Sequence, residues 1–126
     1  MTISASGSAD AGTAWERYAV PANWPRWAPQ ITRVAASADR LAAGVTGRVF
    51  GPLGVSADFT VDAVDEPARR WAWTVSRGPL TVRLQHGVRP RERGGSSTWL
   101  SIDAPLPIAF GYVPLAYLAI RRLVAG

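Results

Sequence analysis

Cysteine and lysine are both absent from this chain of 126 residues. Without cysteine the chain forms no disulfide bridge, thiolate metal site or cysteine nucleophile. All fourteen basic residues are arginine, and the formal net charge is +5. Only the segment 89–93 gathers arginines closely, and its polar, glycine-bounded sequence indicates a solvated hairpin tip. We therefore expect no nucleic-acid partner.

Histidine is nearly absent too, since His86 is the only one in the chain. A single histidine without cysteine excludes the common zinc sites. The sequence also lacks a nucleophile elbow, a phosphate-binding glycine loop and a dinucleotide fingerprint. We therefore expect neither a metal nor a cofactor, and most familiar enzyme classes are excluded.

Long charge-free runs are rare, and the longest covers residues 104–120. It is shorter than the ~20 residues of a membrane-spanning helix. Pro105, Pro107, Gly111 and Pro114 also interrupt it. We therefore expect no membrane contact. Because the first twelve residues lack a basic, then apolar, leader pattern, we expect a cytoplasmic protein.

Helices are predicted near both ends of the chain. Residues 14–19 carry an apolar stripe at helical spacing, capped by Ser8 or Asp10 and ended before Pro21. A second short helical turn is expected over residues 23–28. The last helix is expected to begin at Pro114, where proline suits a first turn. Its apolar residues cover most of its circumference, which predicts burial on most sides.

Between these helices the sequence alternates in the manner of an antiparallel meander. The expected strands cover 31–37, 45–50, 55–64, 70–77, 80–88 and 97–104, with a short strand at 2–6 before the first helix. In the segment 55–64, Val55, Ala57, Phe59, Val61 and Ala63 are expected to share the buried face. The order of elements predicts one α+β domain, 1–126, with helices on one face of a curved antiparallel sheet. A cavity is expected where the last helix does not fill the sheet.

Several segments give the chain a resemblance to a known superfamily. They are AWERYAVPANWPRWAPQITRV at 14–34, GVTGRVFGPLG at 44–54, FTVDAVDEPARRWAWTV at 59–75, LQHGV at 84–88 and RRLV at 121–124. In these segments the chain resembles the SRPBCC superfamily, also called START-like or Bet v 1-like, which includes polyketide cyclases, dehydrases and lipid transport proteins. The resemblance implies a helix-grip fold, with a curved antiparallel sheet wrapped around the C-terminal helix and two short N-terminal helices. It also implies an interior pocket for a hydrophobic small molecule.

Aromatic and apolar side chains are the candidate ligand-binding residues of such a pocket. Flat aromatic walls suit planar apolar ligands. The candidates are Trp24, Trp27, Phe59, Trp71, Trp73, Leu84, Leu100 and Tyr117.

His86 and Tyr112 are the candidate catalytic residues. His86 lies on the apolar face of its strand, where it is either a hydrogen-bonded core residue or a general acid/base. The hydroxyls of Tyr112 and Tyr117 point either into the cavity or to solvent.

Two main functions are compatible with this pattern. One is binding of a lipid- or polyketide-like molecule without chemistry, and the other is a polyketide cyclase, aromatase or dehydratase using His86 on a hydrophobic carbonyl compound. A third role, partner binding by an apolar C-terminal patch, predicts a possible homodimer.

Overall fold

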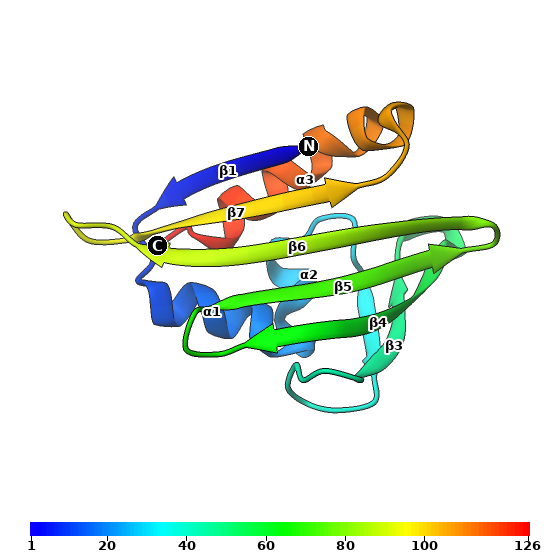
Figure 1. The fold of residues 1–126 in the computed structure, drawn as a ribbon, viewed down its shortest axis with the longest axis horizontal. Helices are drawn as coiled ribbons and strands as arrows, with labels where there is room; N and C mark the ends of the chain where they lie inside the picture. Colours follow the sequence, from blue (N-terminus) through cyan, green and yellow to red (C-terminus); the bar gives the residue numbers. More distant parts are fainter.

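A seven-stranded antiparallel sheet forms one layer of the molecule, and α1, α2 and α3 lie against its concave side (Figure 1). The computed structural model describes residues 1–126, except for the side chains of Leu106 and Phe110. The strand order is β1-β7-β6-β5-β4-β3-β2. The elements are β1 (Thr2–Gly7), α1 (Ala11–Ala19), η1 (Pro21–Asn23), α2 (Trp24–Trp27), β2 (Arg33–Ala36), β3 (Thr46–Phe50), η2 (Pro52–Gly54), β4 (Ser56–Asp65), β5 (Arg70–Arg77), β6 (Leu80–Pro90), β7 (Ser96–Asp103) and α3 (Leu106–Leu123).

The predicted α+β class and the helix-grip arrangement are confirmed. Period-two alternation decides which side of each strand is buried. In β7, for example, Thr98, Leu100 and Ile102 are buried while Trp99 and Ser101 between them are partly exposed. The sheet therefore has one face on the helices and one face toward solvent.

Two expected positions of the segment 55–64 are wrong. Val55 is 45% exposed and lies just before β4, and Ala63 within β4 is exposed because of a bulge. The pairing of β4 with β5 shifts register between Val61 and Ala63. A bulge inserts one extra residue and reverses the side to which the following side chains point. Ala63 is consequently exposed, and Val64 is the half-buried residue that packs against the core.

The first helix forms where it is expected, and Asp10 rather than Ser8 caps it. The Asp10 carboxylate accepts a hydrogen bond of 2.7 Å from the Thr13 N–H, satisfying one of the free donors of the first turn. Hydrogen bonds from the backbone and the side chain of Thr13 hold the pKa of Asp10 below its usual range. Trp15 and Tyr18 are then buried against the sheet.

The last helix differs from its prediction in length and in burial. It is continuous over Leu106–Leu123, with Pro114 inside it rather than at its start. The ring removes one helical hydrogen bond, yet the neighbouring turns remain packed on the sheet through small and apolar side chains. Burial on most sides is also wrong, because Leu115 and Leu118 are 44% and 42% exposed. This exposed side of α3 is the patch through which a homodimer is predicted.

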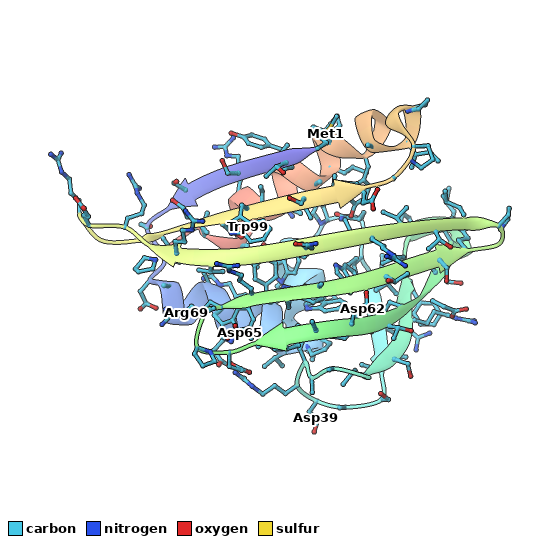
Figure 2. All side chains as sticks on the ribbon, viewed as in Figure 1. Met1, Asp39, Asp62, Asp65, Arg69 and Trp99 are labelled. Carbon is cyan, nitrogen blue, oxygen red and sulfur yellow. The ribbon has the colours of Figure 1, made fainter. Side chains whose placement is uncertain are left out.

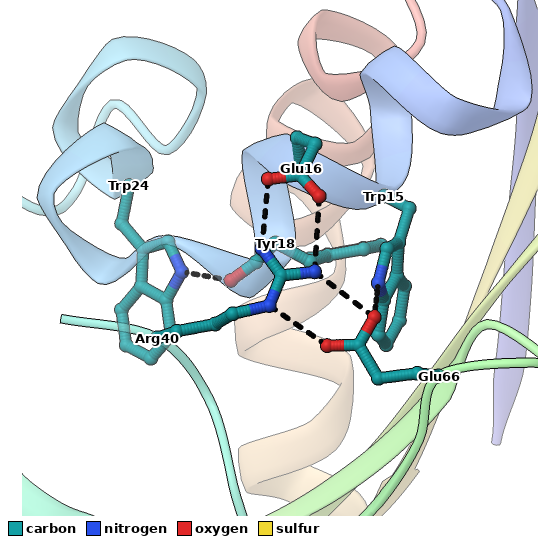
Figure 3. A network of polar contacts seen from close by, with 6 residues as sticks. All are labelled: Trp15, Glu16, Tyr18, Trp24, Arg40 and Glu66. Atoms are coloured by element: carbon teal, nitrogen blue, oxygen red, sulfur yellow. Dashed lines mark hydrogen bonds and ion pairs between the residues drawn. The ribbon is translucent and has the colours of Figure 1, made fainter. Parts of the chain in front are cut away.

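Arg40 links α1 to the turn between β4 and β5 (Figure 3). Its guanidinium donates to both oxygens of Glu16 in α1 and to both oxygens of Glu66 in the turn after β4, over 2.8–2.9 Å. The Trp15 indole N–H donates to the same Glu66 at 2.6 Å. Because these charges are roughly half exposed, the cluster fixes the position of α1 more than it stabilises the fold.

Gly87 in β6 has no room for a side chain, because the Trp99 indole lies over it. It pairs with Trp99 of β7, which lies on the face of the sheet turned toward the viewer in Figure 2. A methyl group on Gly87 would overlap the Trp99 indole. Gly87→Ala is therefore expected to lower the free energy of unfolding by about 1–3 kcal/mol in urea denaturation.

A double-mutant cycle tests the cause of this loss. Trp99→Leu in the Gly87→Ala background should recover part of the stability. Gly111→Ala is the matched control, because nothing lies within 4 Å of its added methyl, and it should stabilise α3. Equal losses from Gly87→Ala with and without Trp99 would contradict this account.

Candidate functional site

A small hollow of about 30 Å³ lies between the concave face of the sheet and α3. This is room for about one water molecule. Its lining comes from the end of α2 and the segment after it, from β5, β6 and β7, and from one side of α3. The lining residues are Trp27, Ala28, Gln30, Ile31, Trp73, Leu84, His86, Leu100, Tyr112, Ala116, Ala119 and Ile120.

Six of the ten predicted site residues line this hollow. They are Trp27, Trp73, Leu84, His86, Leu100 and Tyr112. Tyr117 does not, because it is 45% exposed on the outer side of α3, so the idea that its hydroxyl points inward is wrong. Trp24, Phe59 and Trp71 are buried beside the hollow without lining it.

The aromatic side chains fill much of the space that they were expected to surround. The Trp24 ring centroid lies 5.4 Å from that of Phe59, 5.6 Å from that of Trp71 and 5.0 Å from that of Trp73. Rings at these distances are in packing contact. The small volume of the hollow follows from this cluster.

His86 is held by hydrogen bonds on both ring nitrogens, and the chain of bonds fixes its tautomer. The Trp73 indole N–H donates to Nε2 at 3.0 Å, so Nε2 carries no proton. Nδ1 therefore carries the proton and donates to the Tyr18 hydroxyl at 3.3 Å. Tyr18 in turn donates to the Thr98 hydroxyl at 2.6 Å, which donates to the Gly87 carbonyl. Every member of the network is satisfied.

This environment opposes protonation of His86. The ring is stacked on Trp71, with centroids 4.7 Å apart. Burial lowers the pKa of His86 to about 3 because a charged imidazolium is poorly solvated there. Burial likewise raises the pKa of Tyr18. At neutral pH the two side chains form an uncharged structural network.

Gln30 is the polar lining residue that sequence reasoning missed. Its side-chain N–H donates to the Tyr112 hydroxyl at 2.9 Å, joining the segment after α2 to α3. Its Oε1 is buried and has no partner among the described residues. Burial also raises the pKa of Tyr112. The available signal was the position of Gln30 between the proline-rich segment and an apolar strand.

The missed apolar lining residues of α3 follow helical spacing. Ala116, Ala119 and Ile120 lie four, seven and eight positions after Tyr112, on one side of the helix. The predicted helix began at Pro114 and so left Tyr112 outside it. The shared side of Tyr112, Ala116, Ala119 and Ile120 could therefore not be predicted.

A larger groove of about 620 Å³ lies outside the sheet, among α1, α2 and the end of α3. Six of its nine lining residues are polar or charged, and they include Arg17, Arg26 and Arg122. Arg17 donates to the carbonyls of Leu123 and Ala125, at 2.7 and 2.6 Å. These bonds satisfy the free carbonyls at the end of α3. The groove is thus a joint between helices, and the inner hollow is the better candidate site.

The described residues also limit other kinds of site. Apart from the side chains of Leu106 and Phe110, no three potential metal ligands converge. Across the described part of the chain, no helix has the length and apolar character needed to span a bilayer.

Comparison with known proteins agrees with this architecture. The structure is similar to the crystal structure of Ara h 8.0201, a Bet v 1-like protein, with a TM-score of 0.77 at 14% sequence identity, covering 98% of this chain and 93% of the other. No curated protein matches the chain in sequence. The family model described as polyketide cyclase / dehydrase and lipid transport matches residues 1–126. The chain therefore belongs to the polyketide cyclase/dehydrase and lipid transport family, within the SRPBCC superfamily.

Proposed function

We propose that the protein binds an apolar, lipid- or polyketide-like molecule between the concave sheet face and α3. The observation that carries this proposal is the inner hollow, whose lining is apolar except for Gln30, His86 and Tyr112. An apolar wall with a few placed polar groups is the usual composition of a small-molecule site. Membership of a family described by polyketide chemistry and lipid transport supports the same ligand class.

Ligand entry requires α3 to move, because sites for small molecules usually enclose ~300–1,000 Å³. The hollow of about 30 Å³ represents the closed form. Pro114 has no N–H to complete a helical hydrogen bond, and bending at such a position is common. The helix also begins without a side-chain cap. We expect α3 to bend at Pro114, so that space opens over Ala116 while Tyr112 stays beside Gln30.

The geometry favours binding over catalysis. A cyclase or dehydratase using His86 would need one ring nitrogen free to exchange a proton with the substrate. Both nitrogens are instead paired with Trp73 and Tyr18, and the imidazole is buried. The enzyme alternative is supported by the family description, which names cyclases and dehydrases, but by no free proton-transfer group on His86.

Titration with the neutral dye N-phenyl-1-naphthylamine tests the proposal. The parent protein should enhance the dye emission saturably, at roughly one equivalent per chain, as expected for one enclosed site. Ala116→Phe places a ring in the hollow and should reduce dye affinity at least ~10-fold, since it removes the apolar contact area. The change would be read together with the thermal melting curve, to confirm that the variant is folded.

Leu118→Phe is the matched control, because it adds a ring on the exposed side of the same helix. Its dye affinity should equal that of the parent. If overpacking prevents Ala116→Phe from folding, Ala119→Val supplies a smaller intrusion on the same wall. Absence of saturable binding to the parent would refute the proposal.

A further inference from the structure

Two polar side chains that line the hollow bond to each other and leave hydrogen-bonding capacity unused. Gln30 comes from the segment between α2 and β2, and Tyr112 comes from α3. The Gln30 Nε2–H donates to the Tyr112 oxygen at 2.9 Å. The pair therefore closes one side of the hollow with polar atoms.

Among the described residues, the Gln30–Tyr112 pair has one hydrogen-bond acceptor and one donor without a partner. Gln30 Oε1 is a buried acceptor, and no described residue donates to it. Tyr112 accepts from Gln30, so its own hydroxyl proton remains to be donated, and no described acceptor takes it. Buried polar groups are nearly always paired, so an unused acceptor beside an unused donor requires an explanation.

His86, the third polar lining residue, pairs with neither the Gln30 Oε1 nor the Tyr112 hydroxyl proton. His86 uses Nε2 to accept from Trp73 and Nδ1 to donate to Tyr18. Trp71 Nε1 is also buried without a partner, but Trp71 does not line the hollow. Among the described lining residues, the unused capacity is on Gln30 and Tyr112 alone.

We propose that Gln30 and Tyr112 recognise a hydroxyl group, alcoholic or phenolic, on the apolar ligand. This inference rests on the proposed function and specifies its ligand class. One hydroxyl oxygen both donates a proton to Gln30 Oε1 and accepts one from Tyr112. The volume of about 30 Å³ accommodates one such group, while the apolar body of the ligand occupies the space opened by α3.

Other oxygen groups satisfy the pair less well. A ketone accepts from Tyr112 but has no proton for Gln30 Oε1. A carboxylate has no proton to donate either, and no arginine lies among the lining residues to balance its charge. A hydroxyl is the simplest group that completes both bonds.

Displacement of N-phenyl-1-naphthylamine by two probes of equal size tests this specificity. The probes are 2-naphthol and 2-methylnaphthalene, in which a methyl group replaces the hydroxyl. The parent should bind 2-naphthol roughly 10-fold more tightly, as expected when two buried hydrogen bonds are completed. Gln30→Met and Tyr112→Phe should each reduce this preference to within about 2-fold, with little change for 2-methylnaphthalene.

Matched controls lie on exposed surfaces of the same molecule. Gln85→Met changes an exposed residue of β6, and Tyr117→Phe changes the exposed tyrosine of α3. Both should keep the preference of the parent for 2-naphthol. A role confined to holding α3 against the segment after α2 would instead weaken both probes equally in Gln30→Met.

Each result decides the question. A preference in the parent that both site variants lose supports the proposal. Equal binding of the two probes by the parent overturns it, as expected if a resident water already completes the pair, and so does a preference that persists in both site variants. Failure of the parent to bind the dye or either probe overturns the proposed function itself, and this inference with it.

Discussion

A chain that ends at Val113 is expected not to fold. The deletion removes five buried residues of the C-terminal segment: Ala116, Ala119, Ile120, Leu123 and Val124. Burial of the three larger side chains contributes roughly 5–9 kcal/mol, which is comparable with the entire stability of a small domain. The deletion also removes the carbonyl of Val124, which accepts from the Ala9 N–H at 3.0 Å.

Urea denaturation followed by tryptophan fluorescence and far-UV circular dichroism measures this effect. Two point variants in the full-length chain serve as matched controls. Ile120→Ala changes a side chain that is 1% exposed and should cost about 2–5 kcal/mol. Leu118→Ala changes one that is 42% exposed and should cost about 0.5 kcal/mol or less. Cooperative unfolding of the truncated chain at the urea midpoint of the full-length chain would mean that α3 is peripheral.

The strands were predictable because successive side chains of a strand alternate between its two faces, and this alternation decides which are buried. Trp71 and Trp73 share a face in the sequence pattern, and both are buried in β5. The antiparallel order followed from short connections such as the turn at Gly78, which adopts a positive φ of 57°. Alternation and turn chemistry agree here, so the sheet could be predicted without knowledge of its partners.

Features decided by tertiary packing were not predictable in the same way. Proline usually ends or kinks a helix, so Pro114 was expected to begin one. In the structure α3 is continuous across Pro114, and Ala109 before it and Ala116 after it are both buried. The bulge before Ala63 similarly has no glycine or proline to mark it, and it appears only in the pairing with β5.

The candidate site was predicted in composition and not in geometry. The sequence indicates that Trp24 and Trp73 are buried, but it does not say whether their rings surround a cavity or fill one. That depends on side-chain packing between α2 and the sheet, where the two rings lie 5.0 Å apart. Gln30 was missed because its importance comes from its contact with Tyr112, 82 residues away.

Acid should destabilise the protein because His86 binds a proton in the unfolded chain more readily than in the folded one. An unfolded histidine has a pKa near 6.5, whereas burial lowers the pKa of His86 to about 3. Between these values the unfolded chain binds a proton that the folded chain does not. The contribution of His86 to stability is therefore complete above about pH 6.5 and falls as the pH is lowered toward 3. The loss reaches on the order of 4 kcal/mol near pH 3.

His86→Asn isolates this effect, because asparagine keeps one donor and one acceptor but does not titrate. The free energy of unfolding would be measured for both proteins from pH 7.5 to pH 4. The parent should lose more stability than the variant over this range, and the two curves should run parallel above pH 7. Asp10 and Glu66, whose pKa values are also lowered, remain in both proteins, so their effect cancels in the difference. Parallel curves down to pH 4 would mean that His86 titrates with an ordinary pKa in the folded protein. Its imidazole would then be available for proton transfer, and the cyclase or dehydratase alternative would regain its chemical basis.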